Sequence, residues 1–250
     1  PMSLPPTSRH ALPDGLEICR LPVGLWQVSG NHGRIDPADA VDRLFDYLDA
    51  GFSTFDLADH YGPAEDFLGQ FRRRLVSERG EESLSSFQAM TKWCPSPGPM
   101  TREVVEEAVG VSLARMQTPC LDVLQFHWWE YSDDRYLEAL SHLADLQSEG
   151  RIGHLALTNF DTEHLAAIVD HGIRVVSNQV QYSLVDRRPE IRQREFCLEH
   201  DIEFLAYGTL CGGLLSEKYH DRPEPSGSEL GTASLHKYKQ MIDRWGGWEL

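Results

Sequence analysis

The chain has 250 residues, 41% of them apolar, and a formal net charge of −16 at pH 7. This length and apolar content suffice for one large α/β domain or two small ones. A surface this acidic repels nucleic-acid phosphates and anionic membranes, so we expect neither as a partner, and no apolar run approaches the roughly 18–20 residues of a membrane span.

The cysteines indicate a reducing compartment. Five are present, widely spaced and without a Cys-x-x-Cys pair, and the first ten residues lack the pattern of a signal peptide. We therefore expect a reduced, cytoplasmic protein. Cys197 and His200 lie three residues apart on an expected helix, but nothing else with ligand spacing is nearby, so no metal site is predicted.

Apolar runs of strand length alternate with helical patterns along the chain. Residues 1–17, rich in proline and polar residues, are expected to form a cap or a disordered lead, with a single domain over residues 18–250. Strands are predicted at 21–26, 53–57, 87–93, 121–129, 154–160, 175–182 and 203–207. Helices are predicted to begin at Pro37, Pro63 and Thr101 and to cover 134–149, 161–172, 189–200 and 233–245.

This alternation predicts a parallel sheet with crossover helices, in seven units of roughly 30 residues. No Gly-x-Gly-x-x-Gly fingerprint follows the first strand, which disfavours an open dinucleotide-binding sheet. Polar residues instead follow successive strands, as in closed barrels, whose sites lie at the carboxyl ends of the strands. The prediction is an α/β protein with a (β/α)8 TIM barrel that lacks its eighth unit. The exposed strand edges make a homodimer a further expectation.

Four polar side chains at these strand ends suggest acid–base chemistry. Asp56 lies at the end of the second strand and Tyr61 in the loop after it. Lys92 lies at the end of the third strand and His127 near the end of the fourth. An ammonium beside a phenol favours the phenolate, so Lys92 is expected to lower the pKa of Tyr61 and make it a general acid. Asp56 would keep Lys92 charged, and His127 could hydrogen-bond the oxygen that gains charge.

Further strand ends offer groups for a flat amide-bearing ligand. Thr158, Asn159 and Gln179 supply hydroxyl and amide partners suited to a carboxamide, and Tyr207 offers a ring face for stacking. Each of these residues also has an ordinary structural interpretation when it is considered alone. Their recurrence in register, on strands that are otherwise apolar, favours one shared site.

The sequence resembles the aldo-keto reductase superfamily. Asp56, Tyr61, Lys92 and His127 match its catalytic tetrad in the segments FDLADHYG, TKW and LQFHWW. The resemblance implies that Thr158, Asn159 and Gln179 hold a nicotinamide carboxamide, that Tyr207 stacks on the ring, and that the following loop lies along the pyrophosphate. That loop includes Gly208, Thr209, Leu210 and Gly212. Trp26 matches the floor of the substrate pocket, and Trp93 and Trp128 are expected to line it.

The resemblance implies NADP(H)-dependent reduction of an aldehyde or ketone to an alcohol, with Tyr61 donating the proton. One departure matters, because the family grips the adenosine 2′-phosphate after an eighth strand and no residue here is assigned to that role. NADP(H) binding is thus expected to be weakened or lost. The alternatives are a cofactor-independent lyase, isomerase or cyclase that uses the same tetrad on a hydrophobic substrate, and a non-catalytic binding module.

Overall fold

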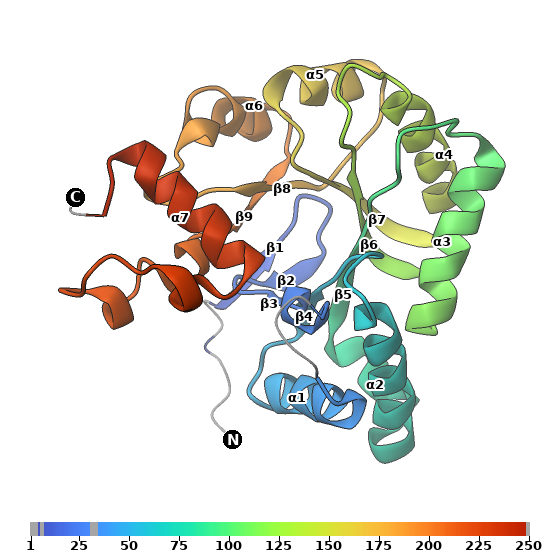
Figure 1. The fold of residues 1–250 in the computed structure, drawn as a ribbon. Helices are drawn as coiled ribbons and strands as arrows, with labels where there is room; N and C mark the ends of the chain where they lie inside the picture. Colours follow the sequence, from blue (N-terminus) through green and yellow to red (C-terminus); the bar gives the residue numbers. More distant parts are fainter. Residues whose placement is uncertain (1–4, 6–7, 31–34, 249–250) are drawn as a thin grey trace.

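The computed structural model describes residue 5, residues 8–30 and residues 35–248. Seven parallel strands form one curved sheet in the order β3-β4-β5-β6-β7-β8-β9, and helices α1 to α6 surround its outer face (Figure 1). Within the described residues no strand joins β9 to β3. The predicted (β/α)8-type fold with one unit missing is confirmed. The strands are β3 Val23–Gly24, β4 Thr54–Asp56, β5 Gln88–Trp93, β6 Leu121–His127, β7 Ile152–Thr158, β8 Ser177–Gln181 and β9 Glu203–Tyr207.

The helices follow the predicted alternation with small shifts at their ends. They are α1 Pro37–Asp49, α2 Ala64–Arg79, α3 Arg102–Met116, α4 Tyr136–Ser148, α5 Thr162–Asp170, α6 Gln193–Glu199 and α7 Ala233–Trp245. The start of α1 shows why the local sequence was informative. The Asp36 side chain accepts a hydrogen bond from the Ala38 N–H, and Pro37 occupies the first helical position, where its missing N–H costs nothing.

Several predicted strands are longer than the real ones, and two of these differences bear on the site. The first was expected over residues 21–26, but β3 ends at Gly24 and Trp26 begins a 3₁₀ helix, η2 (Trp26–Val28). Leu25 takes φ −100° and ψ 17°, which leaves the extended region, so the chain turns before Trp26. Similarly, β6 ends at His127, so Trp128 and Trp129 lie beyond the strand.

A cap or a disordered lead was expected over residues 1–17, and the described residues from Ser8 onward form a β-hairpin that acts as a cap. β1 (Arg9–Ala11) pairs antiparallel with β2 (Glu17–Cys19), and the predicted boundary at residue 18 falls inside β2. Leu12 and Ile18 of the hairpin pack in one buried cluster with side chains from the strands, namely Met90, Val123, Ala156 and Val176. Because these side chains point into the barrel, the hairpin covers one end of the barrel interior.

Side chains alternate between the barrel interior and the helix layer along each strand. On β7, Leu155 and Leu157 belong to the large cluster between sheet and helices, whereas Ala156 belongs to the interior cluster. The same alternation sends Thr158 inward with Ala156, two residues before it. Register places His127, Thr158 and Gln179 side by side on three neighbouring strands. The functional side chains therefore meet at the end of the barrel opposite the hairpin, which we call the mouth.

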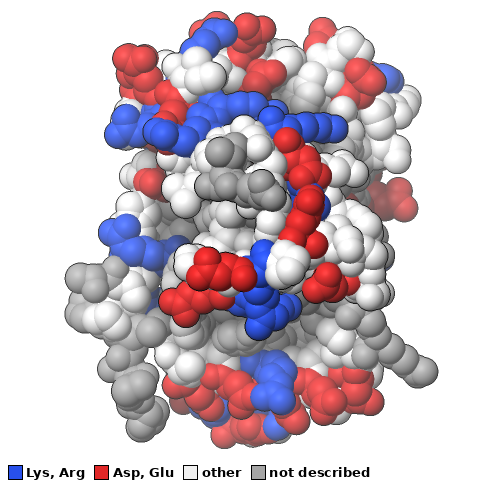
Figure 2. Space-filling view, turned by 60° about the vertical axis from the view of Figure 1, so that its left-hand side comes forward, with Lys and Arg blue, Asp and Glu red and all other residues white. Residues whose placement is uncertain are grey.

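Helix α7 lies in the sector between α6 and α1 (Figure 1). It packs through Tyr238 and Ile242 into a small separate cluster with Cys211, Leu214 and Leu230. Figure 2 shows the side of the molecule that carries α7, where acidic groups border basic ones. Lys239 of α7 pairs with both Glu224 and Asp243, for example. Among the described residues, no helix is long and apolar enough to cross a membrane.

Candidate active site

A buried ion pair forms the base of the site. Asp56 ends β4 and Lys92 lies near the end of β5, the neighbouring strand. The Lys92 Nζ atom lies 2.6 Å from Asp56 Oδ2 and 3.1 Å from the carbonyl oxygen of Leu57, and the Lys92 side chain is only 3% exposed. A buried ammonium persists only when it is paired and hydrogen-bonded, so Asp56 and Leu57 hold a positive charge inside the barrel.

Two glutamine amides complete this polar layer. Gln125 Nε2 donates to Asp56 Oδ1 at 2.8 Å, and Gln179 Nε2 donates to the same oxygen at 3.0 Å. Gln179, expected beside a carboxamide, directs its Nε2 atom to Asp56 and to the Gln125 Oε1 atom. Gln125 was not singled out from the sequence, although it lies two residues before His127 and therefore on the same face of β6.

Tyr61 lies above this layer, in the loop that follows β4. Its ring centroid is 5.5 Å from Lys92 Nζ and 5.0 Å from the Trp26 ring in an edge-on contact. The expectation that Lys92 lowers the pKa of Tyr61 is wrong: burial, and after it the negative charge of Asp56, raises the pKa well above its usual value. Lys92 is already neutralised by Asp56, so Tyr61 holds its proton firmly until an oxygen of greater basicity approaches.

His127 is held between two polar neighbours. Its Nε2 atom lies 3.3 Å from Asn159 Nδ2 and its Nδ1 atom 3.5 Å from Cys94 Sγ. If the Asn159 amide donates to Nε2, the Nδ1–H donates to the thiol, which assigns the tautomer from the hydrogen bonds. Burial, followed by the charges of His60 and Lys92, lowers the pKa of His127 to about 4. The imidazole is therefore neutral at pH 7.

This lowered pKa predicts a dependence of stability on pH. Between an ordinary value of about 6.5 and the folded value of about 4, the unfolded chain binds the additional proton. The free energy of unfolding should therefore fall as pH drops through this window, by up to about 1.4 kcal/mol per pH unit. Urea unfolding at pH 7 and pH 5 measures the change: between these two pH values, His127→Asn should lose less free energy of unfolding than the wild type. His220→Asn, on an exposed side chain, is the control and should behave as wild type; equal losses in all three proteins would contradict the assignment.

Asn159 lies next to His127, and Tyr207 lies next to Asn159. Asn159 adopts φ +63°, a left-handed conformation that asparagine tolerates better than most residues. Its Oδ1 atom accepts from the Tyr207 hydroxyl at 3.1 Å, and its backbone carbonyl accepts from the Tyr131 hydroxyl at 2.9 Å. The buried Thr158 Oγ1 atom has no hydrogen-bond partner among the described residues. An unpaired buried hydroxyl beside Asn159 suits the carboxamide end of a nicotinamide.

The loop expected along the pyrophosphate is covered by α7. The Tyr238 side chain lies so close to Gly208 and Gly212 that a Cβ atom at Gly208 would clash with its hydroxyl. Lys237 Nζ lies 5.0 Å from the centroid of the Tyr207 ring, the face expected to stack on a nicotinamide. Leu210 is exposed. The hydroxyl and amide at the nicotinamide end of the predicted cofactor site fit a carboxamide. Lys237 lies over the Tyr207 ring and α7 covers the loop, so both must move if the cofactor is to bind as expected.

Two aromatic residues expected in the substrate pocket do not line the mouth. Trp128 is fully buried in the core between sheet and helices, where its Nε1 donates to the carbonyl oxygens of Glu130 and Asp133. Trp93 is 6% exposed and packs against Phe126 in the same core. It follows the inward-facing Lys92, so the alternation of β5 sends it outward.

Trp26, the third residue expected in the substrate pocket, and Trp129 do reach the mouth. Trp129 is 59% exposed and packs against His127, with ring centroids 4.0 Å apart and the ring planes tilted by 40°. Trp26 contacts Tyr61 and donates from its Nε1 to Ser234 Oγ of α7 at 3.1 Å. A substrate that approached Tyr61 would therefore meet Trp26 and Trp129.

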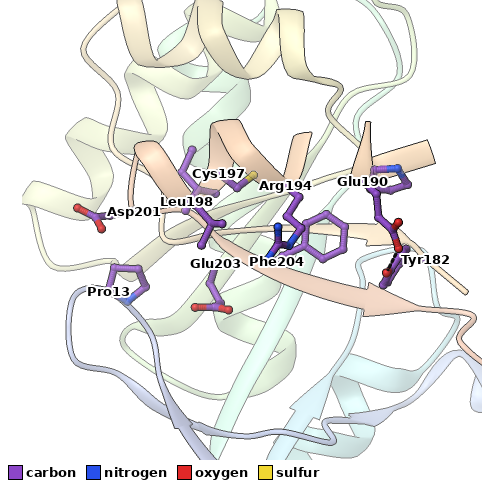
Figure 3. Close-up of a pocket in the computed structure, with 11 residues that line it drawn as sticks. Pro13, Tyr182, Glu190, Arg194, Cys197, Leu198, Asp201, Glu203 and Phe204 are labelled. Atoms are coloured by element: carbon purple, nitrogen blue, oxygen red, sulfur yellow. Dashed lines mark hydrogen bonds between the residues drawn. The ribbon is translucent and has the colours of Figure 1, made fainter. Parts of the chain in front are cut away.

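A separate cavity of about 340 Å³ lies away from the tetrad, at the free edge of β9 (Figure 3). Its described lining comes from α6, β9, η4 (Arg188–Glu190) and the hairpin turn at Pro13. Tyr182 and Glu190 hydrogen-bond to each other on its wall. Because no tetrad residue lines this cavity, it is not the place where the tetrad would act.

The fold and the position of the site define a barrel protein with its polar residues at the carboxyl ends of parallel strands, the arrangement of barrel enzymes. The chain belongs to the aldo/keto reductase family, whose sequence model matches residues 20–245. It is similar to the chloroplastic pyridoxal reductase of Arabidopsis thaliana, at 27% identity over 76% of this chain and 55% of that protein. It is also similar to aldo-keto reductase YhdN of Bacillus subtilis, at 26% identity over 86% of this chain and 66% of that protein.

Solved structures of aldo-keto reductases are also similar to this chain. An aldo/keto reductase from Brucella melitensis superimposes with a TM-score of 0.68 at 26% identity, over 84% of this chain and 75% of that one. A thermostable aldo-keto reductase in complex with the inhibitor epalrestat gives a TM-score of 0.71 at 26% identity, over 84% and 76% of the two chains. The chain thus spans between about half and two thirds of the two curated relatives named above.

Proposed function

We propose that the protein is an NADP(H)-dependent oxidoreductase that reduces an aldehyde or ketone to an alcohol. The observation that carries the proposal is the Asp56–Lys92 pair directly below Tyr61, with neutral His127 on the neighbouring wall. These residues join a proton donor, a fixed positive charge and a hydrogen-bonding imidazole at one mouth. Pyridoxal reductase and the NADH-specific methylglyoxal reductase of Escherichia coli are similar proteins whose names describe carbonyl reduction.

Each residue has a distinct chemical task in this proposal. A reduced nicotinamide, when bound, supplies hydride to the carbonyl carbon. Tyr61 donates its proton to the carbonyl oxygen as that oxygen becomes an alkoxide, which is basic enough to take it despite the raised pKa of the phenol. Lys92 then stabilises the phenolate, and Asp56 keeps Lys92 in place. His127 orients the carbonyl oxygen through a hydrogen bond from Nε2 in the tautomer that carries its proton there, which forms once Asn159 turns away and Nδ1 accepts from the Cys94 thiol instead.

The nicotinamide end would be held by Thr158, Asn159 and Tyr207. Thr158 offers a buried unpaired hydroxyl, and the Asn159 amide is already fixed at its oxygen by Tyr207. Gly208, Thr209, Leu210 and Gly212 would contact the pyrophosphate after α7 moves. Because one relative is named NADH-specific, titrations with NADPH and NADH side by side decide the preference between the two cofactors.

Asn159→Gly should weaken NADPH binding by about tenfold, the equivalent of one or two lost hydrogen bonds. Glycine tolerates φ +63°, so the variant removes the side chain without straining the backbone. Quenching of tryptophan fluorescence by NADPH measures the change, and the thermal midpoint should stay close to that of the wild type. The control is His220→Asn, because the His220 side chain is exposed, and this variant should bind NADPH as the wild type does. Asn178→Gly is unsuitable as a control because Asn178 is fully buried. Unchanged affinity in Asn159→Gly would remove Asn159 from the proposed cofactor site.

A cofactor-independent lyase, isomerase or cyclase is the second candidate. The observation that favours it is α7, because Tyr238 covers Gly208 and Gly212 while the tetrad stays assembled. Tyr61 and His127 would then serve as the acid–base pair on a hydrophobic substrate bound against Trp26 and Trp129.

One pair of assays separates the two candidates. NADPH is titrated by tryptophan fluorescence, and its oxidation is then followed with a generic aldehyde. Micromolar binding with oxidation that depends on Tyr61 supports the reductase. Saturable turnover of a substrate in the absence of any nicotinamide supports the second candidate and contradicts the first. Lack of turnover under both conditions points to a non-catalytic module.

Further proposals concern partners and compartment. Small carbonyl compounds are the proposed substrates, and the five free thiols support a reducing, cytoplasmic environment. A homodimer is proposed because β3 and β9 each have one unpaired edge within the described sheet. Light scattering coupled to size exclusion tests this, and a monomeric mass at all concentrations would contradict it.

A further inference from the structure

Three potential metal ligands converge beside the tetrad. Asp59 and His60 follow β4, and Cys94 follows β5, so the loops after two neighbouring strands bring them together. One ligand atom from each lies within 4.8 Å of the others. The sequence spacing gave no sign of this group, because Cys94 is far from the Asp59–His60 pair along the chain.

The backbone holds the three residues in place. The Asp59 N–H donates to the Lys92 carbonyl at 2.9 Å, which continues the β4–β5 pairing beyond the strands. Asp59 Oδ2 accepts from the Cys94 N–H at 3.0 Å, and Asp59 Oδ1 lies 2.9 Å from His60 Nδ1. Asp59 therefore already links the other two residues, and little chain entropy remains to be lost when a ligand joins them.

The donor set and its spacing suit zinc. Thiolate, imidazole and carboxylate are its usual ligands, at about 2.3 Å for sulfur and about 2.0–2.2 Å for nitrogen and oxygen. Around a tetrahedron these lengths put ligand atoms about 3.3–3.7 Å apart. The three ligand atoms lie within 4.8 Å of one another, so they need to approach by at most about 1.5 Å to reach that spacing. The imidazole of His60 and the carboxylate of Asp59 are 44% and 23% exposed, so an ion from solvent can reach them.

The charge of Asp59 disfavours a thiolate at Cys94 unless a cation joins the two groups. Burial, followed by the negative charge of Asp59, raises the pKa of the Cys94 thiol well above its usual value. The thiol thus stays protonated beside the carboxylate when nothing else is bound. A divalent cation removes that repulsion, because the metal binds the thiolate and the carboxylate together. The thiol proton leaves to the buffer as the sulfur–metal bond forms, so charge and atoms balance.

We propose that Asp59, His60 and Cys94 bind one zinc-class divalent cation at the mouth, with water in the fourth position, and that this ion inhibits the protein. The inhibitory part rests on the proposed function. The centroids of the His60 and Tyr61 rings lie 4.9 Å apart, and Cys94 Sγ lies 3.5 Å from His127 Nδ1. An ion held there lies beside both the proton donor and the imidazole, and it obstructs the approach of a carbonyl to them.

Binding is tested directly with Co²⁺, a spectroscopic stand-in for zinc. The full chain should show the visible bands of tetrahedral cobalt and a thiolate-to-cobalt charge-transfer band at one equivalent. Competition with Zn²⁺ then gives the zinc affinity. Cys94→Ser should abolish the charge-transfer band and weaken zinc at least about tenfold, and His60→Gln should weaken it by a similar factor. Cys120→Ser is the matched control, because Cys120 is half-buried and lies outside the group.

The experiments test zinc binding and inhibition separately. A charge-transfer band that Cys94→Ser retains, or that Cys120→Ser removes, overturns the site. In the activity assay, the rate of NADPH oxidation by each protein is expressed relative to its own rate without zinc. The Zn²⁺ concentration that halves this rate should be at least about tenfold higher for Cys94→Ser than for the wild type. If zinc binds through Cys94 but leaves the rate unchanged, the site stands and its inhibitory role is rejected. The cobalt spectra need no turnover, so failure of the proposed function leaves the binding test intact.

Discussion

Tyr61→Phe should reduce the rate of carbonyl reduction by about 10²–10⁴-fold, the usual contribution of a positioned general acid. The phenyl ring keeps the edge-on contact with Trp26 at 5.0 Å and the place above Lys92, so the variant should fold and bind NADPH as the wild type does. Steady-state kinetics with a generic aldehyde and NADPH fluorescence titration measure the two quantities separately.

The matched control is Tyr131→Phe, which removes a phenol whose hydroxyl donates to the Asn159 carbonyl rather than facing the Lys92–Asp56 pair. It should retain most of the wild-type rate. A Tyr61→Phe protein that keeps more than about a tenth of the wild-type turnover would show that Tyr61 is not the general acid.

Asp56→Asn should destabilise the folded protein by about 3–5 kcal/mol, because it leaves the Lys92 ammonium buried without its carboxylate. The two glutamine amides that now donate to Asp56 Oδ1 would also lose a charged acceptor. Urea unfolding measures the change in the free energy of unfolding. Turnover should fall as well, since Lys92 would no longer stabilise a Tyr61 phenolate in a fixed position.

Asp49→Asn provides the comparison for a surface pair. The Asp49 carboxylate lies 2.6 Å from Arg79, but both side chains are well exposed, so this substitution should cost less than about 1 kcal/mol. Similar losses of stability in the two variants would contradict the assignment of Asp56–Lys92 as a buried, desolvated pair.

Much of the fold could be predicted because local patterns and tertiary structure agree here. α7 has the predicted bounds, 233–245, and Asp36-Pro37 begins α1 as its capping chemistry requires. Strand ends were less predictable. The apolar run at residues 21–26 resembles a strand, but Leu25 leaves the extended region and directs Trp26 to the mouth.

Side-chain direction explains most of the errors at the site. Trp93 and Trp128 are adjacent to mouth residues in sequence, yet alternation sends Trp93 to the helix layer, and the turn after β6 buries Trp128. Alternation would have identified Gln125 in the same way, two residues before His127. The pKa of Tyr61 could not be inferred from its neighbours in sequence, because it depends first on how deeply the fold buries the phenol and then on the negative charge of Asp56 beside it.

Contacts between distant segments were beyond the reach of the sequence. The packing of Tyr238 on Gly208 and the hydrogen bond from Trp26 to Ser234 connect α7 to the mouth. Neither leaves a local signal, since α7 has the amphipathic pattern of any surface helix. The convergence of Cys94 with Asp59 and His60 depends likewise on the parallel pairing of β4 with β5.

Transfer of deuterium is the most direct test of carbonyl reduction at Tyr61. The wild-type protein is mixed with an aldehyde and NADPH that carries deuterium at the transferring position of the nicotinamide ring, and the product is analysed by mass spectrometry. We expect an alcohol that contains one deuterium on the former carbonyl carbon, and almost none of it with Tyr61→Phe. A product formed without deuterium, or formed equally well when the nicotinamide is omitted, would contradict hydride transfer at this site.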